Sequence, residues 1–363
     1  MNKTITSFFS ALSITSACVL PFMLASTLPG LASSPSHAEQ PQLPAIATNT
    51  ALDSARQPMV ALALGGGGVR GAAHIGVLRV LQKEGIPIDC IVGNSMGAVV
   101  GGLYCANVPL DKIQSILSDG SLVSAYLPHF LWCRIMISPF RSLLYVGRTK
   151  PYAGLVSGTK LKATINKLLP SPNLKVEDLK VPFSSIAVSL IDGQAHVLSE
   201  GNVDEVLQAS ATLPLLMQPV PIGKHLYVDG GIRNNLPTTE ARHSGARVVI
   251  SVEIDNDLKP VPAKQFTSYR KVFDRVMNAT IEQLDEDKVN GADIVIRPEL
   301  INIPILSKDR KYVDDATTAG EIAARKALPR IIERLQQSGI DLRNRSANLD
   351  FATPKEPVTP ERL

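Results

Sequence analysis

A serine between two glycines, Gly93-Asn94-Ser95-Met96-Gly97, is the clearest candidate for chemistry in this chain. The apolar run Ile88 to Val92 precedes it, and the small apolar residues Ala98 to Ala106 follow. A G-x-S-x-G turn between a strand and a helix requires glycines because its backbone is tight, and it lifts the serine hydroxyl to the carboxyl edge of the sheet. Because both flanking patterns are present, the sequence predicts a nucleophile elbow here and not a glycine turn with an incidental serine.

A second candidate is the glycine-rich segment Gly65 to Gly71, which precedes a helical pattern. Glycines let the backbone approach a ligand and direct N–H groups into a cavity, and a helix N-terminus favours negative charge. The segment therefore predicts a binding site for an oxyanion or a phosphate. Gly66-x-Gly68-x-x-Gly71 nearly fits a dinucleotide fingerprint, but Asp89 precedes the next apolar run instead of ending it. A P-loop is excluded because no Gly-Lys-Ser/Thr follows.

The third candidate is Val228-Asp229-Gly230-Gly231, where a carboxylate ends an apolar strand pattern. The glycines leave room beside the carboxylate. Asp-Gly is also one of the commonest turn dipeptides, so this motif alone is compatible with a purely structural turn.

The elements that must position these residues alternate along the chain. Strand patterns lie at Met59 to Leu64, Ile88 to Val92, Phe183 to Leu190, Ala195 to Leu198, His225 to Val228, Val248 to Ile254 and Asp293 to Ile296. Helical patterns lie at Gly71 to Glu84, Ala98 to Ala106, Phe266 to Asn290 and Tyr312 to Gln337. Strands that alternate with helices indicate an α/β fold, in which a central, largely parallel sheet is covered on both faces in three α/β/α layers.

Together the three motifs resemble those of the patatin-like phospholipase family. The family's G-G-G-x-[RK]-G loop matches Gly66 to Gly71, its elbow matches Gly93 to Gly97, and its D-G-[AG] motif matches Asp229 to Gly231, in the same order. A further family feature, A-S-x-x-x-P with a later proline, is present from Ala209-Ser210 through Pro214 to Pro219. The resemblance covers about Met59 to Leu335.

This resemblance implies a serine lipid acyl hydrolase in which Ser95 is the nucleophile and Asp229 is its base. It also implies an oxyanion hole made of the backbone N–H groups of Gly66, Gly67 and Gly68. The other motif residues are expected to support the geometry of the site, and they are Arg70, Gly71, Gly93, Gly97, Gly230 and Gly231. Arg70 has two open roles, bracing of the loop or contact with a lipid phosphate. No metal and no organic cofactor is expected. The chain departs from many relatives at Met217, where they have an aromatic residue near the acyl site, so its chain-length preference stays open.

A Ser–Asp–His triad is the alternative to the dyad, and the order Ser95, Asp229, His243 permits it. If Asn235 to His243 is helical, His243 lies about 12 Å along the axis from the helix start. This distance favours the two-residue arrangement.

Composition supports a globular protein. The 363 residues are 45% apolar and 19% charged, which excludes a disordered chain, and the formal net charge of +4 gives no case for nucleic-acid binding. Apart from Cys18, the cysteines are Cys90, Cys105 and Cys133, which have no metal-ligand spacing and allow at most one disulfide.

The first 38 residues differ from the rest. No formal charge occurs at the 35 positions between Lys3 and Glu39, and an apolar stretch runs from Phe8 to Leu28. We expect a signal peptide, cleaved near Ser36-His37-Ala38, or a retained N-terminal anchor, and hence an exported protein. The expected organisation then continues with a linker at 39–58, the catalytic domain at 59–337 and a flexible tail at 338–363.

Residues 120–176 contain eight basic and no acidic residues, with aromatic residues among the earlier ones. This pattern suits an interfacial cap that binds an anionic membrane surface, but a helical subdomain with a core of aromatic residues fits equally. The expected substrate is a phospholipid or lysophospholipid; the sequence does not determine a protein activator. Two alternatives remain, a nucleotide-binding protein and a non-catalytic lipid-binding or secreted interaction protein.

Overall fold

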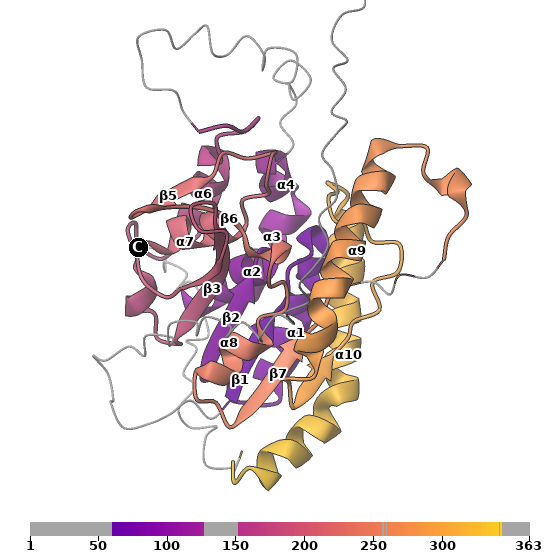
Figure 1. Cartoon of the computed structure of the whole chain (residues 1–363). Helices are drawn as coiled ribbons and strands as arrows, with labels where there is room; N and C mark the ends of the chain where they lie inside the picture. The colour runs from indigo at the N-terminus through magenta and orange to yellow at the C-terminus, as the bar shows by residue number, and fades with distance from the viewer. Residues whose placement is uncertain (1–59, 127–151, 256–257, 259, 341, 343–363) are drawn as a thin grey trace, which may run out of the picture. The chain divides into compact units, whose positions relative to one another are not determined.

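In the part of the chain that the computed structural model describes, eight strands form one mixed sheet, in the order β5-β6-β3-β2-β1-β7-β8, with β4 paired to β3. Figure 1 shows this sheet among the helices. The strands are β1 (Val60–Leu64), β2 (Cys90–Asn94), β3 (Phe183–Ser189), β4 (Ala195–Leu198), β5 (Val220–Ile222), β6 (His225–Asp229), β7 (Val248–Val252) and β8 (Ile294–Ile296). The pairs β1–β2, β2–β3, β1–β7 and β7–β8 are parallel, whereas β4 and β6 pair with β3 antiparallel and β5 pairs with β6 antiparallel.

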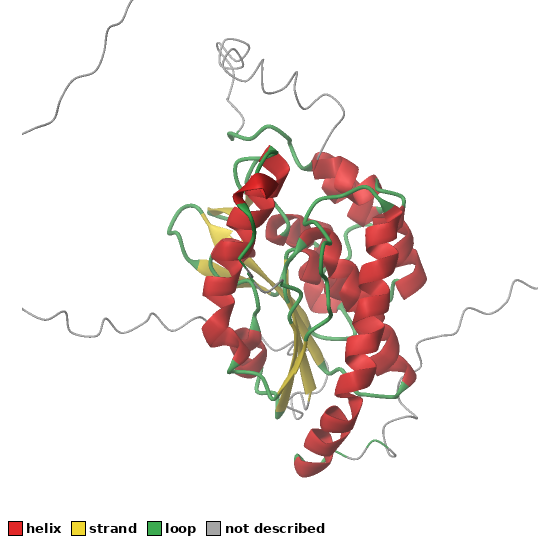
Figure 2. Ribbon diagram, turned by 90° about the vertical axis from the view of Figure 1, so that its right-hand side faces the viewer, coloured by secondary structure: helices red, strands yellow, loops and turns green. Residues whose placement is uncertain are grey.

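The structure describes residues 60–126, 152–255, 258, 260–340 and 342. The predicted leader, the linker, the central part of the basic segment and nearly all of the predicted tail therefore lie outside the described residues. Helices cover both sides of the sheet in Figure 2. They are α1 (Ala72–Lys83), α2 (Met96–Cys105), α3 (Leu110–Ser118), α4 (Ser121–Tyr126), α6 (Thr159–Asn166), α7 (Val203–Ser210), α8 (Thr238–His243), α9 (Tyr269–Val289) and α10 (Arg310–Gln337), with the short 3-10 helices η1 (Gly68–Gly71) and η4 (Gly230–Ile232).

The central strands are buried on both faces, which explains their continuous apolar runs. In β1, Val60, Leu62 and Leu64 join the large core that includes residues of α1, α2 and α10. The alternate residues Ala61 and Ala63 join a smaller cluster with residues of α8. A strand with period-two side chains and helices on both faces must be apolar throughout. The predicted three-layer α/β fold with a largely parallel sheet is confirmed.

Strand β3 determines where the two chemical motifs meet. Its Ile186 pairs with Asn94 at the end of β2, and the next residue, Ala187, pairs with Asp229 at the end of β6. Strand β4 pairs with Ile186 and Ala187 along one edge of β3, so β2 and β6 both pair along the other edge of β3. Because β2 is parallel and β6 antiparallel to β3, their carboxyl ends point toward each other. The reversal of β6 therefore brings the turns after β2 and β6 together.

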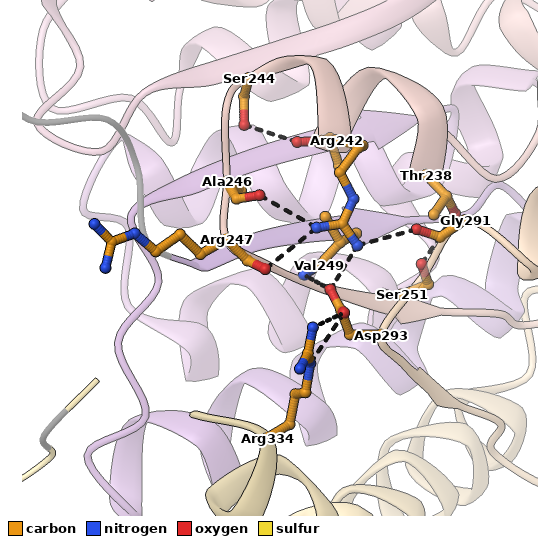
Figure 3. Close-up of polar contacts among 11 residues, drawn as sticks. Thr238, Arg242, Ser244, Ala246, Arg247, Val249, Ser251, Gly291, Asp293 and Arg334 are labelled. Carbon is orange, nitrogen blue, oxygen red and sulfur yellow. Dashed lines mark hydrogen bonds and ion pairs between the residues drawn. The ribbon is translucent and has the colours of Figure 1, made fainter. Parts of the chain in front are cut away.

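A partly buried ionic contact joins helices on the two faces of the sheet near β8 (Figure 3). Asp293, just before β8, accepts hydrogen bonds from Arg242 of α8 at 2.5 Å and from Arg334 of α10 at 2.7 Å. The backbone N–H of Val249 in β7 donates to the same carboxylate at 2.8 Å. Partial burial opposes the charge, but these donors lower the pKa of Asp293, so one carboxylate holds a helix from each face to the sheet.

The described part of the 120–176 segment packs some of its apolar side chains into the core and leaves other residues exposed. Tyr126, Leu161 and Ile165 are buried in the large cluster, whereas Tyr152 is 49% exposed. The aromatic residues between 127 and 151 lie outside the described residues, so the choice between an interfacial cap and a packed subdomain stays a prediction there. The thiols of Cys90 and Cys105 are free and buried, and Cys133 is not among the described residues. Among the residues that the structure describes, none of the helices combines the length and apolarity needed to cross a bilayer.

Candidate active site

Ser95 lies in the sharp turn between β2 and α2. Its backbone has φ 51° and ψ −119°, a conformation that a residue with a side chain adopts only under strain. Gly97 allows the turn to pack, because a Cβ added there would lie 2.3 Å from the carbonyl oxygen of Leu64. Gly93 is the β2 residue that pairs with Leu64 on one side and with Ser185 on the other. The predicted strand–turn–helix context of the serine is therefore present.

Asp229 faces this serine across the gap between β2 and β6. The Oγ of Ser95 donates a hydrogen bond to Oδ2 of Asp229 at 2.6 Å, and the N–H of Gly231 donates to Oδ1 at 2.8 Å. The carboxylate is buried, with 4% of the residue exposed. Burial raises the pKa of Asp229 to about 6, against the opposing effect of the hydrogen bonds from Ser95 and Gly231. The two residues of the predicted dyad, 134 positions apart, are in direct contact.

The glycine-rich loop passes beside the serine, and its glycines differ in what their N–H groups do. The N–H of Gly66 donates to the carbonyl of Asn235 at 3.3 Å. Gly67 and Gly68 line the cavity next to Ser95, and no acceptor for their N–H groups is found among the described residues. Gly68 has φ +61°, and a Cβ there would lie 2.0 Å from the carbonyl oxygen of Ile305. Only glycine fits at this position.

Arg70 braces the loop from below. Arg70 is 3% exposed. Its Nε donates to the carbonyl of Ile303 at 2.8 Å, and its Nη1 donates to Oδ1 of Asn278 at 2.7 Å. Burial lowers the pKa of Arg70, while the charges of Asp255 and Asp274 act in the opposite direction. Of the two predicted roles, the geometry favours bracing over contact with a lipid phosphate, because the guanidinium is not at the surface.

Two asparagines, which the sequence analysis did not single out as site residues, connect the loop to the elbow. The Nδ2 of Asn94 donates to Oδ1 of Asn235 at 3.1 Å, and the Nδ2 of Asn235 donates to the carbonyl of Gly66 at 3.4 Å. A Cβ on Gly66 would lie 2.6 Å from that Asn235 oxygen, and a Cβ on Gly230 would lie 2.4 Å from Oδ1 of Asn94. The motif glycines 66 and 230 therefore make room for this amide pair.

Ser210, at the end of α7, supports the elbow. Its Oγ accepts from the N–H of Ser95 at 3.0 Å and donates to the carbonyl of Ile186 at 2.7 Å. Ser210 belongs to the Ala209-Ser210 motif of the sequence, which did not indicate this role. His74 of α1 supports the loop in a similar way: Nε2 lies 2.8 Å from the carbonyl oxygen of Gly65. Complete burial lowers the pKa of His74 to about 4, so its ring is neutral and donates to that carbonyl at neutral pH.

An apolar cavity opens to solvent above Ser95 and Asp229, and the space free of atoms within it and at its open mouth totals roughly 660 Å³. Besides the loop and the dyad, it is lined largely by apolar side chains, including Met96, Val123, Tyr126, Leu213, Pro214, Ile232, Met277, Ile281, Ile305 and Leu306. No histidine is among the described residues that line it, and His243 lies at the end of α8, so the geometry favours the dyad over the triad. Met217 is 1% exposed and is not part of this lining.

Fold and site together define an α/β protein whose strained serine turn is paired with a buried aspartate under a glycine loop. Residues 62–242 match the model of the patatin-like phospholipase family, and the chain belongs to this family.

Similar proteins share this region. The chain is 33% identical over 197 residues to the patatin-like phospholipase domain-containing protein 7 of Rattus norvegicus and 34% identical over 197 residues to the patatin-like phospholipase domain-containing protein ZK370.4 of Caenorhabditis elegans. Each match covers 54% of this chain and 13% of the relative, so the chain corresponds to a small part of those proteins. Human GIVD cytosolic phospholipase A2 aligns with a TM-score of 0.42 and 11% identity, over 79% of this chain and 60% of the enzyme.

Proposed function

We propose that this protein hydrolyses the carboxylic acyl esters of phospholipids or lysophospholipids, with Ser95 as nucleophile and Asp229 as general base. The observation that carries the proposal is the 2.6 Å hydrogen bond from Oγ of Ser95 to Oδ2 of Asp229 at the floor of an apolar cavity. Family membership supports the same chemistry, and a relative from Debaryomyces hansenii, 31% identical over 195 residues, is named a lysophospholipase.

The raised pKa of Asp229 is what allows a carboxylate to act as the base. A general base is most effective when its pKa is near the working pH. At about 6, Asp229 is ionised at neutral pH and is more basic than an exposed aspartate at its ordinary value of 3.8. As Ser95 attacks the ester carbonyl, Asp229 takes the hydroxyl proton and a covalent acyl-enzyme forms. Asp229 then returns the proton to the leaving alcohol and activates the water that releases the fatty acid.

The oxyanion that develops on the ester needs N–H donors that have no other acceptor. We assign this role to Gly67 and Gly68, and to Met96, because the first N–H groups of a helix lack an acceptor within it. Gly66 is not assigned as an oxyanion donor, because its N–H already donates to the carbonyl of Asn235. It keeps the loop close to the serine. Loss of one oxyanion donor typically costs about 3 kcal/mol of transition-state stabilisation.

The apolar lining of the cavity suits an acyl chain, and exposed apolar residues beside it suit a membrane surface. Leu215, next to the lining residues Leu213 and Pro214, is 92% exposed, and Val276, next to Met277, is 57% exposed. Side chains of this kind near a lipid site insert at the headgroup boundary. We therefore include membrane-surface binding in the proposal, together with export through the N-terminal segment.

Hydrolysis of a short-chain nitrophenyl ester and fatty-acid release from phosphatidylcholine and lysophosphatidylcholine test this function. We expect Ser95→Ala and Asp229→Asn to lose activity, whereas Ser157→Ala and Asp178→Asn, which change an exposed serine and an exposed aspartate away from the cavity, retain it. Full activity in either dyad variant would refute the mechanism. Vesicle binding by the wild-type protein with no release of fatty acid would favour the non-catalytic lipid-binding alternative.

A further inference from the structure

Two histidines and an aspartate gather away from the dyad, where β4 and β6 flank β3. Asp192 lies in the turn between β3 and β4, His196 is the second residue of β4, and His225 is the first residue of β6. The small side chains of Ala187 and Ser189 on β3 lie between these two strands, since Ala187 pairs with His196 and Ser189 pairs with Tyr227. The fold therefore brings together three side chains from segments that are about 30 residues apart in the sequence.

One carboxylate oxygen faces both imidazoles. Oδ2 of Asp192 lies 3.0 Å from Nε2 of His196 and 3.8 Å from Nδ1 of His225. One ligand atom from each residue can be chosen so that all three lie within 4.8 Å of one another. The two rings are edge to face, with centroids 4.6 Å apart. Metal–nitrogen and metal–oxygen bonds of about 2.0–2.2 Å require ligand atoms that are closer to one another than 4.8 Å. Small rotations of the side chains bring them to that distance.

We propose that Asp192, His196 and His225 bind a divalent transition-metal ion of the zinc class, with water at the remaining position. Two imidazole nitrogens and one carboxylate oxygen are a donor set that Zn²⁺ and its neighbours Co²⁺ and Ni²⁺ accept, whereas Mg²⁺ and Ca²⁺ prefer oxygen alone. The side chains of His196, His225 and Asp192 are 26%, 19% and 39% exposed, so an ion reaches the site directly from solvent.

Each ring has a neighbouring hydroxyl, and that of Tyr227 orients His196. The Oη of Tyr227 lies 3.1 Å from Nδ1 of His196, and Tyr227 itself is buried. When Nε2 of His196 binds the ion, the ring proton resides on Nδ1 and is donated to Tyr227, an arrangement that fixes a metal-binding histidine. The Oγ of Ser189 accepts from the N–H of Ile191 at 3.2 Å and lies 2.9 Å from Nδ1 of His225. A bound ion replaces this hydroxyl as the partner of Nδ1.

The ion would act on structure, not on the ester. His225 and Asp229 are four residues apart on β6, which corresponds to about 13 Å along an extended strand. An ion at the cluster joins the turn that carries Asp192 to the start of β6, the strand that ends in Asp229. This inference does not depend on the proposed hydrolysis.

Titration of the untagged full-length protein with Zn²⁺ by calorimetry and with Co²⁺ by visible absorption tests the site. We expect one equivalent to bind and a saturating level of Zn²⁺ to raise the Tm by roughly 5 °C. Asp192→Asn, His196→Gln and His225→Gln should each weaken binding by roughly 100-fold or more, and Tyr227→Phe by roughly tenfold, since loss of a partner that orients a ligand costs 10–100-fold. His243→Gln is the matched control and should bind as the wild type does.

The outcomes separate this site from others in the chain. Absence of binding by the wild-type protein would overturn the proposal, as would binding that survives Asp192→Asn and both histidine substitutions. Binding that is lost in His243→Gln but kept in His225→Gln would place the ion elsewhere. Because Asp192 is in an exposed turn, Asp192→Asn does not threaten folding, and a wild-type far-UV circular dichroism spectrum and Tm in the absence of metal verify that each variant is folded.

Discussion

The buried charge of Asp229 opposes folding, and the variant Asp229→Asn measures by how much. The pKa of this carboxyl is about 6 in the folded protein and 3.8 ordinarily, because burial outweighs the hydrogen bonds from Ser95 and Gly231. One pKa unit corresponds to about 1.36 kcal/mol, so ionised Asp229 lowers the free energy of unfolding by roughly 3 kcal/mol at pH 7. Asparagine has nearly the same shape and no charge. We therefore expect the inactive variant to be more stable than the wild type.

The effect of Asp229 on the free energy of unfolding depends on pH. Below pH 3.8 the carboxyl is neutral in both the folded and the unfolded chain and has no effect. Between pH 3.8 and about 6 the unfolded chain releases the proton while the folded protein keeps it, so rising pH reduces stability. Above this range the penalty is constant. The gain in Asp229→Asn should grow from roughly 0.5 kcal/mol at pH 4 to roughly 3 kcal/mol at pH 7.

Urea unfolding of both proteins between pH 4 and pH 8 provides the measurement. His74 also titrates in this range, but it is present in both proteins, so its contribution cancels in the difference. Asp178→Asn changes an exposed aspartate and should show no such gain. A variant that is no more stable than the wild type at pH 7, or a gain that is the same at every pH, would refute the reasoning.

The kcat/KM for ester hydrolysis should fall as the pH drops through about 6, the pKa of Asp229; constant activity down to pH 5 would contradict its role as base. Ser210→Ala removes the acceptor of the Ser95 N–H and should lower kcat roughly tenfold with KM unchanged. Between pH 6.5 and 4 the lowered pKa of His74 lets the unfolded chain, but not the folded protein, bind a proton at this ring, so stability falls as the pH falls. In the Asp229→Asn background, His74→Gln should abolish this loss. An unchanged pH slope of the free energy of unfolding in urea would exclude the assignment to His74. Leu215→Asp should reduce co-sedimentation with anionic vesicles while nitrophenyl ester turnover is kept.

Long buried elements were the most predictable from sequence. The strands at the centre of the sheet have continuous apolar runs, and α10 has a long helical pattern, so their positions were predicted within a few residues. Helices α3 and α7 and the three-residue strand β5 were not predicted. Strand β5 contains Pro221 and lies at the edge of the sheet, where pairing with β6 and not an apolar pattern defines it.

The candidate active site and the metal-binding cluster also contain features that the sequence predicts and features that it does not. The glycine loop, the turn around Ser95 and the Asp229 motif are local features, because each needs particular residues at fixed spacing to make a tight backbone. The amide pair Asn94–Asn235 spans 141 positions and has no local pattern, and the metal-binding cluster depends on the pairing of β4 and β6 with β3. No sequence motif could have indicated either of them.

The sequence by itself determined which residues have reactive groups and which turns present them. The tertiary structure decided that the serine and the aspartate meet, because the antiparallel direction of β6 makes it end where β2 ends, at adjacent residues of β3. It also decided which loop N–H groups are engaged: the carbonyl of Asn235 accepts from that of Gly66, whereas the residues that the structure describes offer no acceptor to those of Gly67 and Gly68. Strand direction and hydrogen-bond partners are set by the packing of distant segments, and no short stretch of residues encodes them.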